Sequence, residues 1–346
     1  MMNRFIRARA AVRKTVRGAI VARAALPAAA LLASAALPSA TRAQDTATPT
    51  PQATPGQVEP GAGAEEPKPE NALAVHGLVG VDFPTEYISR GLVLEDQGFI
   101  AQPYMELDFT LFEAKDAAVS KGTFFGGIWN SLHSQHTDAG LTSADPDTGV
   151  RPGVTTDMWY EFDWYLGAAF DFGDFNLNLS YWEFISPNQG FGTSKNWQAK
   201  LAYNDTKLWN GGKDSGFALK PYGIVFLETD GKAGSGSDEG IYVELGVEPT
   251  IFTLGKEGTY PLAFSVPAKV GLGFSDFYED DDMLGFVSVG LKASVPMAFM
   301  PTKYGAWTAS AGVYYYYYGD GVDDFNKGTG DGNDDIVGSL GVSFTF

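Results

Sequence analysis

The strongest constraint in this sequence is a repeated alternation of apolar and polar residues with a period of two. It begins near Leu73 and recurs to the last residue, in segments that are mostly ten or more residues long. In residues 104–112, for example, one face of such a segment carries Met105, Leu107, Phe109 and Leu111. This period is typical of β-strands with two different faces. Strands in soluble proteins usually run about five or six residues, whereas strands that cross a bilayer need about 9–11.

About twelve such segments can be recognised. They cover residues 73–89, 99–112, 122–132, 157–172, 174–185, 195–204, 217–229, 240–253, 262–275, 283–298, 305–319 and 335–346. Long alternating strands separated by turn residues are typical of transmembrane β-barrels. The predicted fold class is therefore all-β, a transmembrane antiparallel up-and-down β-barrel of about 12 strands in a bacterial outer membrane.

The connections between the segments alternate in length. If the first strand starts in the periplasm, the outer connections are long and include residues 133–157 and 319–335, whereas the turn at 172–174 is tight. Outer-membrane barrels have long outer loops and short periplasmic turns. The connection at 204–216 is longer than this pattern predicts for its side.

The chain ends on an alternating segment, "GVSFTF". We expect this last strand to pair with the first, because an open sheet edge in hydrocarbon leaves backbone N–H and C=O groups unsatisfied. The residues expected to face lipid are Ile336, Leu340, Val342, Phe344 and Phe346. The terminal Phe also resembles the signal read by the barrel-assembly machinery. The expected partners are thus this machinery, outer-membrane lipid and lipopolysaccharide. The alternative is a soluble β-sandwich that ends on a buried edge strand.

The N-terminal region differs from the rest. The first 43 residues contain eight of the 24 basic residues and no acidic residue, followed by an apolar run and small residues, as in a secretory signal peptide. A membrane anchor is the alternative, but the run is shorter than the ~20 residues needed to span. Residues 44–71 are rich in Pro, Ala and Thr and predict a disordered linker. The predicted domains are signal peptide 1–43, linker 44–71 and barrel 72–346.

Charge excludes one class of function. Without residues 1–43 the chain keeps 16 basic residues against 42 acidic ones. Nucleic-acid binding needs a basic surface, so none is expected.

The alternation also predicts which charged side chains line the pore. The candidates are Arg90, Glu106, Asp108, Glu161, Asp163, Lys200, Lys220, Glu244, Glu248, Lys269 and Lys292, with Arg90 expected at the outer mouth. Charged rings in a pore determine its selectivity. We therefore expect a porin-like channel for passive diffusion of small hydrophilic solutes that weakly favours cations or neutral solutes. The alternative is an occluded barrel with a structural or surface-interaction role.

Aromatic residues form a second pattern. Trp159, Trp164, Trp182, Trp307 and the tyrosines at 314–318 are candidates for interfacial girdles, where rings lie at headgroup level. Inward-facing Tyr314, Tyr316 and Tyr318 could instead form a sugar-binding track.

Metal and enzyme chemistry have weaker support. The acidic outer loops could bind Ca²⁺ or Mg²⁺ through Asp320, Asp323, Asp324, Asp331 and Asp335, and no other cofactor is expected. Solvated loop charge is the competing interpretation. Ser131 or Ser134 beside His133 resembles the dyad of an outer-membrane phospholipase, but no residue is recognisable in the sequence as orienting the base. We therefore expect no enzyme.

Residues 77–187 resemble one known family. The stretch "GLVGVDFPTEYISRGLVLEDQGFIAQPYMELDF", then "GTFFGGIWNS" with Trp129, the triplet Glu161-x-Asp163-x-Tyr165 and Pro187 follow one another in the order seen in the TorF-type porin family. The resemblance implies an outer-membrane barrel with pore activity and no particular substrate. Its matched polar residues are Arg90, Glu161 and Asp163. The second half of the chain shares only the alternation and the terminal Phe.

Overall fold

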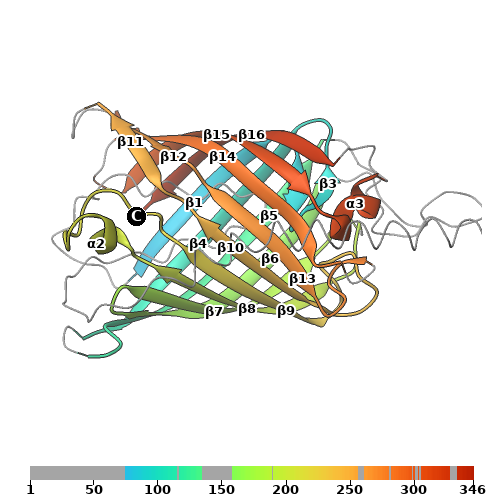
Figure 1. The fold of residues 1–346 in the computed structure, drawn as a ribbon, viewed down its shortest axis with the longest axis horizontal. Helices are drawn as coiled ribbons and strands as arrows, with labels where there is room; N and C mark the ends of the chain where they lie inside the picture. The colour runs from blue at the N-terminus through green and yellow to red at the C-terminus, as the bar shows by residue number, and fades with distance from the viewer. Residues whose placement is uncertain are drawn as a thin grey trace, which may run out of the picture. The chain divides into compact units, whose positions relative to one another are not determined.

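A computed structural model describes residues 75–114, 117–134, 158–188, 190–255, 261–279, 282–297, 299–300, 303, 305–327 and 333–346. The predicted signal peptide and linker lie outside these residues. Within the described part, no helix is long and apolar enough to cross a membrane. Antiparallel strands dominate, as Figure 1 shows.

Twelve wall strands form one closed sheet. Ten of them are single strands: β1 (Val75–Pro84), β4 (Ile100–Glu113), β5 (Lys121–His133), β6 (Trp159–Phe172), β7 (Phe175–Ile185), β8 (Ser194–Tyr203), β9 (Tyr222–Asp230), β14 (Leu284–Pro296), β15 (Ala306–Tyr318) and β16 (Asp334–Thr345). The other two consist of β10 (Ile241–Val247) with β11 (Thr250–Leu254), and of β12 (Leu262–Ser265) with β13 (Ala268–Phe274). The predicted count is therefore confirmed.

Prolines explain the two interrupted strands. Pro249 separates β10 from β11, and Pro267 separates β12 from β13. Proline has no backbone N–H to donate to a ladder, so pairing lapses at such positions. The neighbouring strand β14 stays continuous and pairs with β13 and with β12.

The first and last strands close the barrel. β1 pairs with β16 over seven residue pairs, with Val81 opposite Val342. Beyond the ladder, the N–H of Gly77 donates to the carbonyl of Phe346, and the N–H of Phe346 donates to the carbonyl of Gly77, both at 2.9 Å. The final residue is thus part of the seam, as the alternation predicted.

The outer face of the wall is apolar. Large apolar side chains that point outward and are exposed occur on every wall strand, among them Val79, Met105, Phe124, Leu166, Leu179, Leu201, Val225, Leu245, Ile251, Phe274, Val289, Tyr315, Ile336 and Leu340. Inward neighbours such as Asp163 and Ser288 are buried. A closed antiparallel wall with this alternation is the structure that crosses a bilayer. The chain is a transmembrane β-barrel of the outer membrane.

The first connection contains a separate hairpin. β2 (Tyr87–Ser89) and β3 (Leu92–Glu95) pair only with each other. Between them, Arg90 and Gly91 both have positive φ, 50° and 91°. Positive φ at both central residues is the geometry of a tight two-residue hairpin turn. The expected first strand, 73–89, is therefore too long: β1 ends at Pro84, and the alternation that continues beyond it belongs to the hairpin.

The long connection after β8 is ordered by Asp205. Its carboxylate accepts hydrogen bonds from the indole Nε1 of Trp209 and from the backbone N–H groups of Leu219 and Lys220. The short helix α2 (Thr206–Trp209) lies within this connection. Figure 1 places α2 and the C-terminus at one end of the barrel, and β3 with helix α3 (Asp320–Lys327) at the other.

Candidate functional site

The charged side chains expected in the pore lie mainly on the inner face of the wall. Buried members are Glu106, Asp108, Glu161, Asp163, Glu244 and Lys292, and partly buried members are Lys200, Glu248 and Lys269. Lys220 departs from the prediction: it has a positive φ of 52° and lies in the turn before β9 rather than in a strand. The interior therefore carries both acids and lysines.

Several of these charges pair with one another. The Nζ of Lys269 lies 3.4 Å from a carboxylate oxygen of Glu244, and that of Lys292 lies 3.4 Å from Glu248. Glu244 also accepts hydrogen bonds from the hydroxyls of Tyr222 (2.9 Å) and Tyr242 (2.7 Å). Charged groups removed from bulk water need such partners. In each pair the lysine charge cancels the carboxylate charge, so these four residues add no net charge to the interior.

The β2–β3 hairpin lies inside the ring of wall strands. Tyr87, Ile88, Leu92 and Val93 are each at most 1% exposed. The hairpin contacts the wall on several sides: Glu95 meets β5, Tyr87 meets β6, and a side chain at Gly91 would touch Phe286 of β14. A segment that touches strands around the circumference occupies the interior. The first outer connection therefore folds inward as a plug.

Arg90 is at the tip of this plug. Its guanidinium carbon lies 4.0 Å from the ring centre of Phe226, 4.9 Å from that of Phe184 and 5.9 Å from that of Tyr242. These three rings project from β9, β7 and β10 and are themselves buried. Arg90 is only 5% exposed, so it does not lie at an open outer mouth, where we expected it. The reason is the inward turn of the hairpin.

Side-chain contacts hold the plug in place. The hydroxyl of Tyr87 donates to Glu161 at 2.7 Å, and that of Tyr278 donates to the carbonyl of Arg90 at 2.6 Å. Asn326 of α3 accepts from the N–H of Val93 at 3.0 Å and donates to the carbonyl of Gly91 at 2.9 Å. Burial, and then the neighbouring Glu161 carboxylate, raise the pKa of Tyr87 well above its usual value. Tyr87 therefore keeps its proton and donates at neutral pH.

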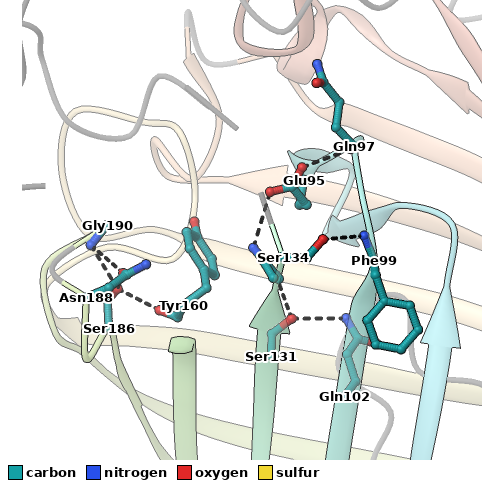
Figure 2. Close-up of polar contacts among 11 residues, drawn as sticks. Glu95, Gln97, Phe99, Gln102, Ser131, Ser134, Tyr160, Ser186, Asn188 and Gly190 are labelled. Carbon is teal, nitrogen blue, oxygen red and sulfur yellow. Dashed lines mark hydrogen bonds and ion pairs between the residues drawn. The ribbon is translucent and has the colours of Figure 1, made fainter. Parts of the chain in front are cut away.

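A chain of polar contacts leads from the hairpin into β5 (Figure 2). Glu95 lies 3.5 Å from Nδ1 of His133, whose Nε2 lies 2.8 Å from the Oγ of Ser131. Ser131 in turn accepts from Gln102 at 3.4 Å. Glu95 therefore orients the histidine. The sequence alone did not indicate a residue for this role. Ser131 is fully buried, so in this conformation the group links the hairpin to the wall and is closed to solutes.

A small cavity adjoins the plug. It has a volume of about 60 Å³ and is lined by Ile88 of the hairpin together with Lys200, Glu244, Lys292 and Tyr316 of the wall. Such a volume holds a few water molecules. The plug and the wall therefore meet at a small cavity to which charged side chains of the wall contribute.

The aromatic residues divide between the two faces. Tyr315 and Tyr317 are exposed outward, whereas Tyr316 and Tyr318 are buried inside. Trp159 is exposed, but Trp182 is buried and stacks on Tyr165 with ring centres 4.0 Å apart. Trp182 is therefore wrong as a girdle residue: it is at an inward position of β7 and fills the interior.

The acidic outer loops contain no metal cluster in the part of the chain that the structure describes, where no three His, Cys, Asp or Glu side chains are grouped for an ion. Asp320 and Asp323 lie on α3, Asp335 lies on β16, and Asp331 is outside the described residues. The side chain of Asp324 is also outside them. Divalent-cation binding stays a prediction.

Comparison with known proteins gives similarity in architecture only. No protein-family model and no curated protein matches the chain. Among solved structures, the COG4313 outer membrane channel from Pseudomonas putida F1 is 9% identical, with a TM-score of 0.42, over 84% of this chain and 100% of that one. The outer membrane channel DcaP of Acinetobacter baumannii is 10% identical, with a TM-score of 0.32, over 79% and 96%. OmpF of Salmonella typhi, in complex with daunomycin, is 9% identical, with a TM-score of 0.34, over 79% and 97%. At this distance, function must be inferred from the chain's own residues.

Proposed function

We propose that the chain is an outer-membrane channel for small hydrophilic solutes, closed in this conformation by the β2–β3 hairpin. The observation that carries the proposal is a separable plug inside a charged barrel. The hairpin forms no backbone ladder with the wall, and side chains make its contacts with the wall and with α3. Behind it lies a chamber lined by charged groups and tyrosines, surfaces that suit polar solutes. The TorF-type resemblance agrees with a pore and stays a prediction.

The closed state is strongly favoured. Four aliphatic side chains of the hairpin, Ile88, Leu92, Val93 and Leu94, are buried. Burial of each contributes about 1.5–3 kcal/mol. Thermal opening is therefore rare, and passage of solutes requires a ligand or partner that favours the displaced hairpin.

The proposed selectivity is a preference for cations or neutral solutes. Glu106, Asp108, Glu161 and Asp163 lie buried on the inner face of β4 and β6. The positive charges of Lys269 and Lys292 are offset by their ion pairs with Glu244 and Glu248. An acid-rich wall raises the local concentration of cations.

The competing function is that of a permanently occluded barrel with a structural or surface role. The buried hairpin favours it, because a plug that never moves needs the same burial. Divalent ions bound at the outer acidic loops belong to this alternative.

Planar-bilayer conductance separates the two functions. We would compare the wild type with a variant in which residues 86–96 are replaced by a short Gly-Ser linker. The channel proposal expects a nearly silent wild type, and stable conductance steps with a cation-selective reversal potential in the variant. A folded variant without steps would establish the occluded barrel instead. Retained folding is checked by the lower mobility that the barrel shows after boiling in detergent electrophoresis.

A further inference from the structure

The wall carries a cage that is complete without the plug. Phe184, Phe226 and Tyr242 come from three wall strands, β7, β9 and β10, whereas the guanidinium that they surround comes from the hairpin. Phe184 and Phe226 are nearly parallel, at 9°, and Tyr242 packs on Phe277 with ring centres 5.3 Å apart. The rings are thus held by contacts with one another and with Phe277 of the β13–β14 connection, and these contacts do not involve the hairpin.

Carboxylates complete the environment of the cage. Glu161, Asp163 and Glu228 all interact electrostatically with Arg90. Among the described residues, none of them forms an ion pair with Arg90 within 4 Å, so the guanidinium is held mainly by the rings and the surrounding negative field.

Glu228 is positioned independently of the hairpin. Its carboxylate accepts backbone N–H groups from Gly234 at 2.9 Å and Gly240 at 2.6 Å, and also from Ala233. These donors belong to the loop between β9 and β10. Withdrawal of the hairpin would therefore leave an aromatic cage with a fixed negative charge beside it and no cation inside.

We propose that this cage is a binding site for guanidinium-bearing solutes and that Arg90 is its built-in competitor. Aromatic cages flanked by carboxylates bind organic cations through cation–π attraction, and a planar guanidinium also stacks on the rings. The inference rests on the proposed channel function. It names the solute class and explains opening: a solute that occupies the cage excludes Arg90 and so favours the displaced plug.

Equilibrium binding tests the cage without any need for conductance. Argininamide would be titrated into purified Arg90→Ala protein in detergent by isothermal titration calorimetry, with methylurea as the neutral, planar control. We expect saturable argininamide binding in Arg90→Ala, no methylurea binding, and at least tenfold weaker argininamide binding to the wild type. Arg90→Gln gives a second vacated cage should Arg90→Ala fold poorly.

The cage residues are tested in the vacated background. Phe226→Leu removes the nearest ring and keeps the volume apolar, and we expect it to weaken argininamide binding by about 5- to 30-fold. Leu227→Ala, on the outer face of the same strand, is the matched control and should leave binding unchanged.

Absence of binding to both Arg90 variants, or equal binding of methylurea, would overturn the site. In bilayers, argininamide added to the wild type should raise the frequency of conductance steps. Binding without conductance would overturn the channel but leave the cage, and conductance without binding would do the reverse.

Discussion

One phenol hydroxyl helps to keep the plug in place. Tyr87 donates to Glu161 in a fully buried setting, and loss of a donor to a buried carboxylate costs about 1–3 kcal/mol. We therefore expect Tyr87→Phe to shift the hairpin toward release and to produce brief conductance steps absent from the wild type. Single-channel recording measures this directly. Tyr315→Phe, on the outer face, is the control, and equal behaviour of the two variants would contradict the role of the hydroxyl.

The same hydroxyl predicts how the plug responds to alkali. Since the pKa of Tyr87 is raised, its neutral form is the one favoured by the closed state. Its contribution is complete below the usual phenol pKa of about 10 and is lost only as the pH rises above that value. We therefore expect the frequency of conductance steps of the wild type to stay constant from pH 7 to about 9.5. An increase within this range that Tyr87→Phe abolishes would disprove this assignment.

Lipid-facing positions should respond to charge according to depth. Val289 lies in the middle of β14 on the outer face, where a lysine costs about 2–4 kcal/mol. We expect Val289→Lys to lower the free energy of unfolding by that amount in lipid vesicles, measured by tryptophan fluorescence in urea. Leu254→Lys, at the end of β11, should cost about 0–1 kcal/mol. Equal costs at both positions would contradict the placement of the membrane.

At the scale of elements, α3 and the hairpin form one closure. The side chain of Asn326 connects α3 to the N–H of Val93 and the carbonyl of Gly91. The chain contains no cysteine, so introduced thiols are the sole ones. We expect Val93→Cys/Asn326→Cys to open more often than the wild type when reduced, because these hydrogen bonds are lost. A short bis-methanethiosulfonate, which forms a disulfide with each thiol, should silence it, and reductant should cleave these disulfides and restore the openings.

Single-cysteine variants are the control for this experiment, since each can react but cannot be bridged. Openings that persist in the crosslinked protein would show that the path does not pass the hairpin.

The elements differ in how far the sequence predicts them. The twelve wall strands follow from period-two alternation, because lipid on one side and a packed interior on the other impose it along each strand. The hairpin is missed because its own residues continue the alternation of β1. The signal that could locate it is "SRGL", where a turn with two positive φ values interrupts the strand. Charge and alternation indicated an inward side for Glu161 and Asp163, but the cage around Arg90 needs contacts between β7, β9 and β10 that no local pattern contains.

At the scale of the whole molecule, closure depends on the last residue. Deletion of Phe346 removes both backbone hydrogen bonds to Gly77, whereas Phe346→Ala removes the ring and keeps the backbone. We expect the deletion to lower the temperature at which the barrel unfolds in detergent more than Phe346→Ala does. Heat-dependent electrophoretic mobility measures both. In cells, a membrane yield reduced equally in the two variants would indicate that the assembly machinery reads the ring.

The hairpin also bears on biogenesis. It follows β1 directly, and β1 is one of the two edge strands that close the barrel, the other being β16. Its docking partners on β9, β10 and α3 are synthesised later, and α3 comes just before the final strand. In a sheet that is not yet closed, the hairpin is therefore attached to β1 at one edge, while its docking partners belong to parts of the chain that are added at the other edge. Insertion of the hairpin and pairing of β1 with β16 are therefore coupled, so substitutions in the docking surface should delay maturation of the barrel.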